Sequence, residues 1–292
     1  RHIGEYTDVP AGDIGVGTRE IGWMFGQYKR ITNRYESGTL TGKGLSWGGA
    51  LVRPEATGYG AVFFLQEMLK VQGRDVEGRT CVVSGAGNVA IHAIEKLQQL
   101  GGRVLACSDS QGYVYDPDGI DLPTLRQVKE VERTTLQAYA GYRGGAVHHP
   151  RGNIWEVPTE LALPCATQNE LAAADARMLV ANGCLAVAEG ANMPTTPEGL
   201  EVLRAGGVLF GPGKAANAGG VATSALEMQQ NAARDSWTFA HTEAKLAEIM
   251  SSIHEQCAVT AEAYGRPGDY VLGANVAGFV RVADAMVALG LI

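Results

Sequence analysis

Apolar residues follow two different periods along the chain, and the change falls near residue 73. Before it, apolar positions three and four residues apart predict an amphipathic helix over residues 19–35 and a second over 56–72, with glycines suited to helix ends after them. After it, short apolar runs recur roughly every 20 to 30 residues and are typical of buried strands. These runs lie at 80–83, 103–107, 161–163, 185–188 and 208–210.

Helical periodicity returns between most of these runs, so strands and helices alternate. The expected helices span 89–100, 122–133, 171–181 and 197–205, and three more follow the last strand at 219–235, 241–264 and 272–289. Such alternation predicts an α/β fold, in which a doubly wound parallel sheet carries helices on both faces. We place this Rossmann-like sheet between about residues 54 and 225, with its ligand site at the carboxyl ends of the strands.

The composition narrows the class of protein. The 292 residues include 24 Lys and Arg against 31 Asp and Glu, and without a basic block we expect no nucleic-acid partner. We also expect no membrane partner, because charged residues or Gln interrupt each helical segment before about 18 residues. Five dispersed cysteines without a Cys-x-x-Cys pair predict neither a disulfide framework nor a metal site. With no secretory signal pattern, a cytoplasmic location fits best.

One glycine-rich turn stands between a predicted strand and a predicted helix. The chain reads VSGAGNVA there, which is a G-x-G-x-x-A pattern. Gly85 allows the tight turn, Gly87 lets the backbone approach a pyrophosphate, and the small Ala90 lets the helix pack on the strand. Asn88 and Val89 open the helix, whose free N–H groups favour phosphate. The alternative is a tight strand-to-helix turn that binds no ligand.

An acidic residue ends the next predicted strand. Asp109 stands 24 positions after Gly85, where a carboxylate usually accepts a hydrogen bond from the ribose 2′-hydroxyl of NAD. The neighbouring Ser108 can instead donate to a 2′-phosphate, and Lys129 or Arg133 can neutralise one. A solvated helix face is the alternative for both basic residues. The motif alone therefore leaves NAD and NADP open.

Five segments together resemble a known family. They read DVPAGDIGVG from Asp8, RPEATGYG from Arg53, SGAGNV from Ser84, EGANMPTT from Glu189 and KAANAGGV from Lys214. In this order they resemble glutamate dehydrogenase of the microbial NADP-linked type, within the Glu/Leu/Phe/Val dehydrogenase family. The resemblance covers the whole chain. Family members carry an additional N-terminal part of roughly 150 residues, about one domain, which supplies catalytic and substrate-binding lysines.

The resemblance implies a reversible reaction, in which L-glutamate, NADP and water give 2-oxoglutarate, ammonium and NADPH. Asp13 matches the family's catalytic aspartate, and the proton transfer assigned to it suits a carboxylate whose pKa is raised by partial burial. Gly12 matches a position whose backbone contacts substrate. Asn217, Val221 and Ser224 match positions that line the substrate, and Ser224 is expected to reach the distal carboxylate. A turn or helix-capping aspartate is the alternative for Asp13.

The resemblance also implies the cofactor contacts. Thr57 and Asn88 match cofactor-contacting positions, and the segment that begins with Ser108 and Asp109 is similar to the NADP-linked branch. We therefore favour NADP, with NAD not excluded, and expect Lys129 to contribute. One departure is that relatives with a second basic residue shortly after this stretch have no counterpart here, where two threonines stand.

The expected organisation is a remnant of a substrate domain (1–53), a dinucleotide-binding domain (54–271) and a C-terminal helix (272–292) that returns to the first domain. By resemblance the assembly is a homo-oligomer, a hexamer. The absence of an initiator Met favours a fragment that is complete only with the N-terminal region. The alternatives are a catalytically incomplete dinucleotide-binding module and a dehydrogenase of another amino acid. The adjacent His148 and His149 are expected in a solvated loop rather than at a metal.

Overall fold

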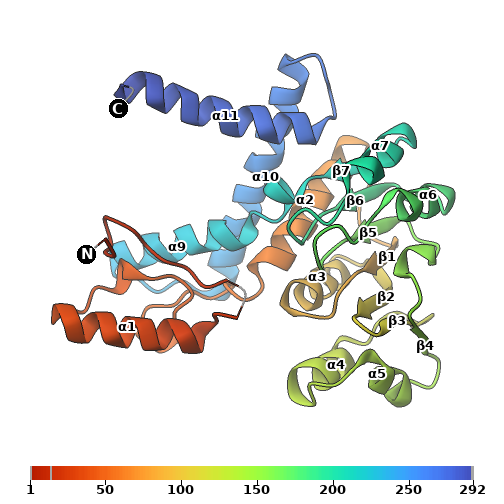
Figure 1. Ribbon diagram of the computed structural model, residues 1–292, viewed down its shortest axis with the longest axis horizontal. Coiled ribbons are helices and arrows are strands. Elements are labelled where there is room, and N and C mark those ends of the chain that lie inside the picture. The colour runs from red at the N-terminus through yellow and green to blue at the C-terminus, as the bar shows by residue number, and fades with distance from the viewer. Residues whose placement is uncertain (1, 14, 291–292) are drawn as a thin grey trace. The chain divides into compact units, whose positions relative to one another are not determined.

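The structure is a computed structural model that describes residues 2–13 and 15–290, and the chain divides into two compact units (Figure 1). Unit 1 comprises Arg1–Ala56 and Gly219–Ile249. Unit 2 comprises Thr57–Ala218 and Met250–Ile292. The long helix α10 (Phe239–Ala263) contributes to both.

Unit 2 is built on a seven-stranded sheet in the order β4-β3-β2-β1-β5-β6-β7. Its strands are β1 (Thr80–Val83), β2 (Arg103–Asp109), β3 (Gly112–Tyr115), β4 (Val147–Pro150), β5 (Leu161–Leu163), β6 (Ala186–Ala188) and β7 (Leu209–Gly211). The strands β2, β1, β5, β6 and β7 pair in parallel, which confirms the predicted doubly wound fold. The winding reverses between β1 and β5, and doubly wound sheets bind ligands at such a switch point.

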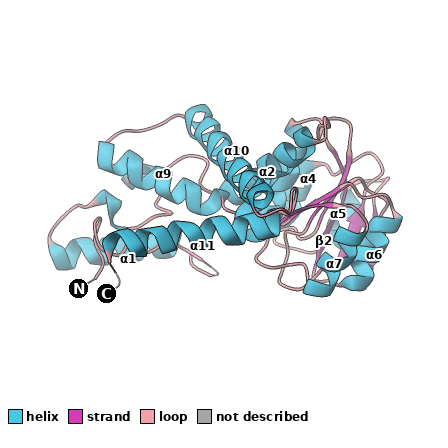
Figure 2. Ribbon diagram, turned by 90° about the horizontal axis from the view of Figure 1, so that it is seen from above, coloured by secondary structure: helices cyan, strands magenta, loops and turns pink. Residues whose placement is uncertain are grey.

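Helices cover both faces of this sheet. The helices of this unit are α2 (Ala56–Val71), α3 (Asn88–Gln99), α4 (Leu122–Arg126), α5 (Leu136–Tyr142), α6 (Ala173–Ala181), α7 (Pro197–Ala205), α8 (Gly213–Ala216) and α11 (Tyr270–Leu289), of which α11 extends away from the sheet, with a π-helical turn η3 (Gln127–Val131) and a 3₁₀ turn η4 (Ile154–Glu156). Alternate strand residues such as Val82 and Val187 pack with Leu179 of α6 and Leu203 of α7. Figure 2 shows the strands between these two helices and α2. Because successive side chains of a strand point to opposite faces of the sheet, each strand packs against the helices on both faces.

Two strands and one helix differ from the expectation of a parallel sheet. Residues Asp109 and Gly112 face each other across a two-residue turn, so β3 folds back antiparallel on β2, and β4 pairs antiparallel with β3. Glycine is required at position 112, because a Cβ there would lie 2.1 Å from the His149 carbonyl oxygen. The four-residue strands β3 and β4 and the seven-residue α5 are too short to give a clear period in the sequence. His148 and His149 therefore lie on β4 rather than in the predicted loop.

Unit 1 joins the start of the chain to helix α9 (Gly219–Ala233). Helix α1 (Thr18–Thr32) and the 3₁₀ turns η1 (Ser37–Thr39) and η2 (Leu45–Trp47) complete its secondary structure before α2. Its small core contains Ile21, Phe25 and Leu40, with Trp47 packed against it. Helical spacing in the sequence predicts core packing for Trp23, and this prediction is wrong, because 63% of its surface is exposed.

The C-terminal helix α11 is apolar yet poorly covered. Val287 and Leu289 are each 82% exposed, and Phe279 is 71% exposed. Contrary to the sequence expectation, α11 is long and apolar enough to cross a bilayer by length and composition, and only 6% of its apolar window is buried. One such helix is weak support for a membrane span, since apolar helices that pack on protein pass the same test.

Candidate active site

The glycine turn after β1 has the geometry that a phosphate needs. Gly85 has φ +88°, in the left-handed region that favours glycine, and its N–H donates to Ser108 Oγ at 2.9 Å. A Cβ built on Gly87 meets no atom within 4 Å, so the space at the turn is open. Gly87 is also the N-cap of α3. The N-terminus of α3, which begins at Asn88, therefore lies at this open turn, and helix N-termini favour anions.

Helix α2 crosses α3 beside this turn at backbone distance. A Cβ on Gly58 would lie 2.6 Å from both Ala93 N and Val89 O, so only glycine permits the crossing. Ala90 is completely buried, as the motif requires of a small residue. The crossing places Thr57, the preceding residue, at the start of α2 next to the first turns of α3.

A half-buried acid supports the turn from the β5 side. Glu170 Oε1 accepts the N–H of Ala166 at 3.0 Å, and burial raises the pKa of this carboxyl group. Ser84 Oγ accepts the N–H of Cys165 at 2.8 Å. A Cβ on Gly85 would lie 3.2 Å from the Cys165 carbonyl oxygen, so the loop after β5 and the glycine turn are in contact. The position of the turn thus depends on this loop.

Asp109 ends β2 among three hydrogen-bond donors. Its Oδ1 accepts the N–H of Gln111 at 2.9 Å, and its Oδ2 accepts the N–H of Leu136 at 2.9 Å and Lys129 Nζ at 3.2 Å. Desolvation raises the pKa of Asp109, but the three hydrogen bonds outweigh it and hold the pKa below its ordinary value. The carboxylate at the predicted ribose position is therefore ionised and paired with a lysine.

Lys129 is held in place by the π-helical turn η3. Its Nζ donates to the Thr134 carbonyl oxygen at 2.8 Å as well as to Asp109. Because an ammonium group has three N–H donors, this geometry leaves one for a further acceptor. Arg133, the other basic candidate, is exposed and has a left-handed φ of +54° after η3. The structure thus brings Lys129 to Asp109. It does not bring Arg133 into contact with this carboxylate.

The loops after β6 and β7 meet at Asn217. This residue caps the C-terminus of α8, and its Nδ2 donates to the Ala191 carbonyl oxygen at 3.3 Å and to Asn192 Oδ1 at 2.8 Å. Three residues at this sheet edge were missed from the sequence: Glu170, Glu189 and Asn192. The available signal was their position in the segments that follow β5 and β6, because polar residues in such segments collect at the ligand edge of a parallel sheet.

The predicted residues of unit 1 lie on the first loop and on α9. Asp13 is exposed, so the partial burial expected for it is absent, and its carbonyl oxygen accepts the Val16 N–H at 2.8 Å. A Cβ on Gly12 would lie 2.4 Å from the Val16 carbonyl oxygen, so this turn requires glycine. On α9, Ser224 is buried and Val221 is 71% exposed.

A buried ion pair fastens α9 to the segment before α2. Lys43 Nζ lies 2.5 Å from Glu227 Oε1, and the two side chains are at most 1% exposed. Desolvation lowers the pKa of Lys43, and the Glu227 carboxylate opposes this. The Gly42 N–H also donates to Glu227 at 3.1 Å. Glu227 follows Ser224 by nearly one helical turn, so the pair fixes the part of α9 that carries this serine.

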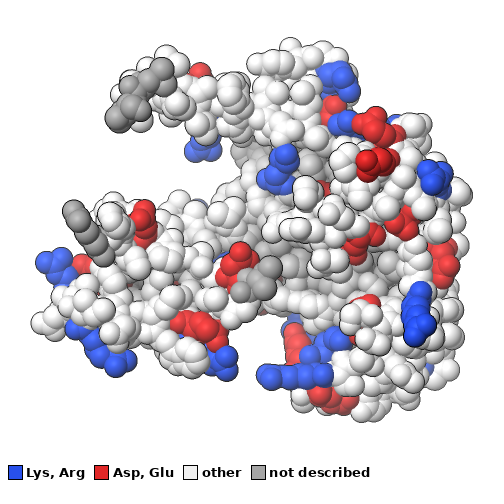
Figure 3. All heavy atoms as spheres, in the orientation of Figure 1, with Lys and Arg blue, Asp and Glu red and all other residues white. Residues whose placement is uncertain are grey.

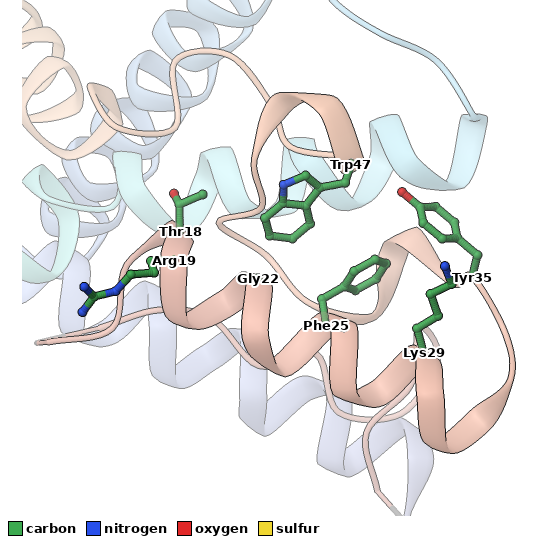
Figure 4. A pocket seen from close by; sticks show the side chains of 8 residues that line it. Thr18, Arg19, Gly22, Phe25, Lys29, Tyr35 and Trp47 are labelled. Carbon is green, nitrogen blue, oxygen red and sulfur yellow. The ribbon is translucent and has the colours of Figure 1, made fainter.

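One surface hollow of about 520 Å³ lies in unit 1, apart from the predicted residues (Figure 4). Its floor is Phe25, whose ring stacks on Trp47 at 5.6 Å and meets the edge of Tyr35 at 5.3 Å. Lys29 and Arg19 also line it. Because it holds none of the predicted polar groups, we assign it no catalytic role.

Charge and potential metal ligands add no second site. Lys and Arg side chains are interspersed with Asp and Glu over the face in Figure 3, without a continuous basic field. Within residues 2–13 and 15–290, no group of three His, Cys, Asp or Glu side chains could hold a metal ion. His149 instead stacks on Tyr113 with ring centroids 4.6 Å apart. The five cysteines are buried and free, and burial raises the pKa of their thiols.

Relatives of known sequence are similar over the whole chain. A glutamate dehydrogenase of Bacteroides thetaiotaomicron is 53% identical over 100% of this chain. The NADP-specific glutamate dehydrogenase of Escherichia coli is 53% identical over 100% of it, and the NAD(P)-specific enzyme of Xylanibacter ruminicola is also 53% identical. The chain spans 66% of the Bacteroides protein and 65% of the Escherichia protein.

Solved structures agree with this similarity. Plasmodium falciparum glutamate dehydrogenase superposes with a TM-score of 0.97 at 47% identity, over 100% of this chain and 63% of its own. A hetero-hexameric glutamate dehydrogenase of Thermus thermophilus superposes with a TM-score of 0.86 at 25% identity, over 100% of this chain and 67% of its own. The family described as Glu/Leu/Phe/Val dehydrogenase, dimerisation domain, matches residues 1–30. The family Glutamate/Leucine/Phenylalanine/Valine dehydrogenase matches residues 48–290, and this chain belongs to it.

Proposed function

We propose that this chain carries the cofactor-binding part, and a portion of the substrate-binding part, of an NADP-dependent glutamate dehydrogenase. The observation that carries the proposal is the Asp109–Lys129 pair beside the open glycine turn. A bare carboxylate at this position favours the 2′-hydroxyl of NAD, whereas a neutralised carboxylate with a lysine tolerates a 2′-phosphate. The NADP-specific relatives support the same choice, and the NAD(P)-specific relative leaves NAD as a second cofactor.

The residues present fit a dinucleotide. The open space at Gly87 and the left-handed Gly85 allow a pyrophosphate to approach the N–H groups of Asn88 and Val89. In this proposal Ser108 and Lys129 hold the ribose phosphate, Asp109 lies beside it and orients Lys129, and Thr57 contacts the cofactor from α2. When bound, NADP accepts a hydride from the substrate α-carbon or returns it.

The proposed reaction converts L-glutamate, NADP⁺ and water into 2-oxoglutarate, ammonium, NADPH and a proton, and runs in both directions. Asp13 moves protons as ammonia leaves or adds, a role for a positioned carboxylate. Ser224 donates its hydroxyl to the distal carboxylate, while Gly12, Asn217 and Val221 line the substrate. A serine at position 224, rather than an apolar residue, favours an acidic side chain over those of Leu, Val or Phe.

The domain organisation is part of the proposal. We assign residues 1–53 to an incomplete substrate domain, 54–271 to the dinucleotide-binding domain and 272–292 to a helix that returns to the first domain. The match of residues 1–30 to a dimerisation domain supports the first assignment, and the exposed apolar side chains of α11 support the last. A homohexamer in the cytoplasm, as expected by resemblance, completes the proposal.

The test uses the 292-residue chain with NADPH, 2-oxoglutarate and ammonium in one cuvette. Loss of NADPH absorbance measures turnover, and NADPH fluorescence measures binding. Binding is the expected result, and turnover in addition means that this chain holds every residue that the reaction needs. Binding without turnover assigns this chain the alternative role of an incomplete cofactor-binding module. A chain that binds neither NADPH nor NADH refutes the proposal.

A further inference from the structure

We propose that Glu189 is a positioning residue for the nicotinamide end of the cofactor, because its buried carboxylate ties the loop after β6 to the loop after β7. The inference rests on the proposed function. It concerns the end of the sheet edge away from Asp109. In the order β2-β1-β5-β6-β7, strands about 4.8 Å apart place β6 roughly 10 Å beyond β1. A dinucleotide whose adenosine lies at β2 and whose phosphates lie at β1 extends across the switch point toward β6.

The carboxylate of Glu189 joins two loops directly. Glu189 is the first residue after β6, it is 5% exposed, and its N–H donates to the Gly211 carbonyl oxygen at 3.0 Å. Its Oε1 accepts the N–H of Thr195 at 3.1 Å, and its Oε2 accepts the N–H of Gly213 at 2.6 Å. Thr195 ends the loop between β6 and α7, and Gly213 begins α8 after β7. One carboxyl group that accepts an N–H on each oxygen therefore fixes the distance between these loops.

The backbones of the two loops touch at this point. A Cβ on Gly213 would lie 2.8 Å from the Ala191 carbonyl oxygen and 3.2 Å from Glu189 Oε2, so glycine is required. The same Ala191 oxygen accepts the Asn217 Nδ2 hydrogen bond, which continues to Asn192 Oδ1. Any change in the spacing that Glu189 sets is therefore transmitted to the two asparagines.

These hydrogen bonds determine which atom of each asparagine is the donor and which is the acceptor. Asn217 uses its Nδ2 inside the pair and keeps Oδ1 as an acceptor, while Asn192 uses its Oδ1 and keeps Nδ2 as a donor. One donor and one acceptor side by side match a primary carboxamide, which presents a carbonyl oxygen and an NH₂ group. The nicotinamide ring carries this group, whereas the adenosine half of the cofactor does not.

The test is the isosteric substitution Glu189→Gln in the 292-residue chain. An amide can accept from only one of the two N–H groups and turns its own NH₂ toward the other, so the loops must separate. We expect the Kd of NADPH, measured by its fluorescence, to rise about tenfold or more. The Kd of adenosine 2′,5′-bisphosphate, measured by calorimetry, should change less than about twofold, because this fragment lacks the nicotinamide. The shift of nicotinamide emission on binding should also be lost.

Glu160→Gln is the matched control. Glu160 likewise accepts a backbone N–H, from Thr80 at 3.1 Å. It precedes β5, however, and so lies at the amino ends of the parallel strands, opposite to the ligand edge. Neither ligand should bind differently to this variant. Gly213→Ala, which pushes the same loops apart while keeping Glu189, should reproduce the selective loss of NADPH and serves if the glutamine variant does not fold.

Two results would overturn the inference while leaving the proposed function in place. Equal weakening of NADPH and the bisphosphate in Glu189→Gln would assign the residue to overall stability. Unchanged NADPH binding in a folded Glu189→Gln chain would remove any role at the nicotinamide end. A wild-type chain that binds neither ligand would overturn the proposed function, and this inference with it.

Discussion

Replacement of Lys129 by alanine tests the choice between NADP and NAD. Lys129 is 20% exposed at its side chain and pairs with Asp109 at 3.2 Å. At an effective dielectric constant of about 20, two unit charges 4 Å apart interact by about 4 kcal/mol, and partial exposure reduces this value. A hydrogen bond to a charged group contributes roughly 1.5–3 kcal/mol. We therefore expect Lys129→Ala to weaken NADPH binding by about 2 kcal/mol, or roughly 30-fold in Kd.

The assay is a fluorescence titration of NADPH and NADH against the wild-type chain and Lys129→Ala. The Kd of NADH should change by less than about threefold, because NADH has no 2′-phosphate. Lys70→Ala, which removes a lysine paired with Glu67 on α2, is the matched control and should leave both values unchanged. Adding Asp109→Asn to Lys129→Ala should restore part of the NADPH affinity, since it removes the carboxylate that Lys129 neutralises. Equal losses for NADPH and NADH would refute the assignment of Lys129 to the phosphate.

Three further predictions follow from local geometry. Gly58→Ala should lower the free energy of unfolding by about 1–3 kcal/mol in denaturant titrations, because its Cβ would lie 2.6 Å from backbone atoms of α3. Gly87→Ala has an open Cβ position, so it should keep the wild-type free energy of unfolding yet bind NADPH more weakly. Asp109 has a lowered pKa, so its contribution to stability is present above its unfolded pKa and is lost as the pH falls through its folded pKa; Asp109→Asn should flatten this acid loss in pH-dependent unfolding, and an unchanged slope would contradict it. The exposed Phe279 and Val287 should make the isolated chain self-associate in light scattering, and Phe279→Ser with Val287→Ser should reduce it; a monodisperse wild-type monomer would contradict this.

The sequence predicted the elements whose period is long or whose context is regular. The parallel strands follow from apolar runs that are buried on both faces, and α3 follows from a glycine turn directly after a strand. The hairpin of β3 and β4 could not be predicted in this way, because each strand has four residues. Periodicity also predicts too wide a buried face for α1, since it identifies an apolar face without showing that anything covers it. Trp23 is the clearest case, at 63% exposed.

The candidate site divides along the same line. Gly85, Gly87 and Asp109 are identifiable because a dinucleotide site constrains backbone at fixed spacing. The neutralisation of Asp109 by Lys129 depends on a π-helical turn that brings residues 20 positions apart together, and no local pattern encodes it. Glu189 stands in the segment EGANMPTT, but the sequence does not reveal its role, because that role requires two backbone N–H groups from segments that are separate in sequence.

Two acids at the ligand edge of the sheet, Glu170 and Glu189, have pKa values shifted in the direction opposite to that of Asp109. Burial raises the pKa of Glu170 and Glu189, so the folded chain holds a proton on each more tightly than the unfolded chain does. Stability is therefore lost as the pH rises through these raised values, because the charged form of each carboxyl group is less favourable in the folded chain than in the unfolded one. Each nevertheless accepts backbone N–H groups of a loop, Glu170 in the loop after β5 and Glu189 directly after β6. A charge that reduces stability yet fixes loop backbone beside a ligand edge is more readily explained by function than by folding.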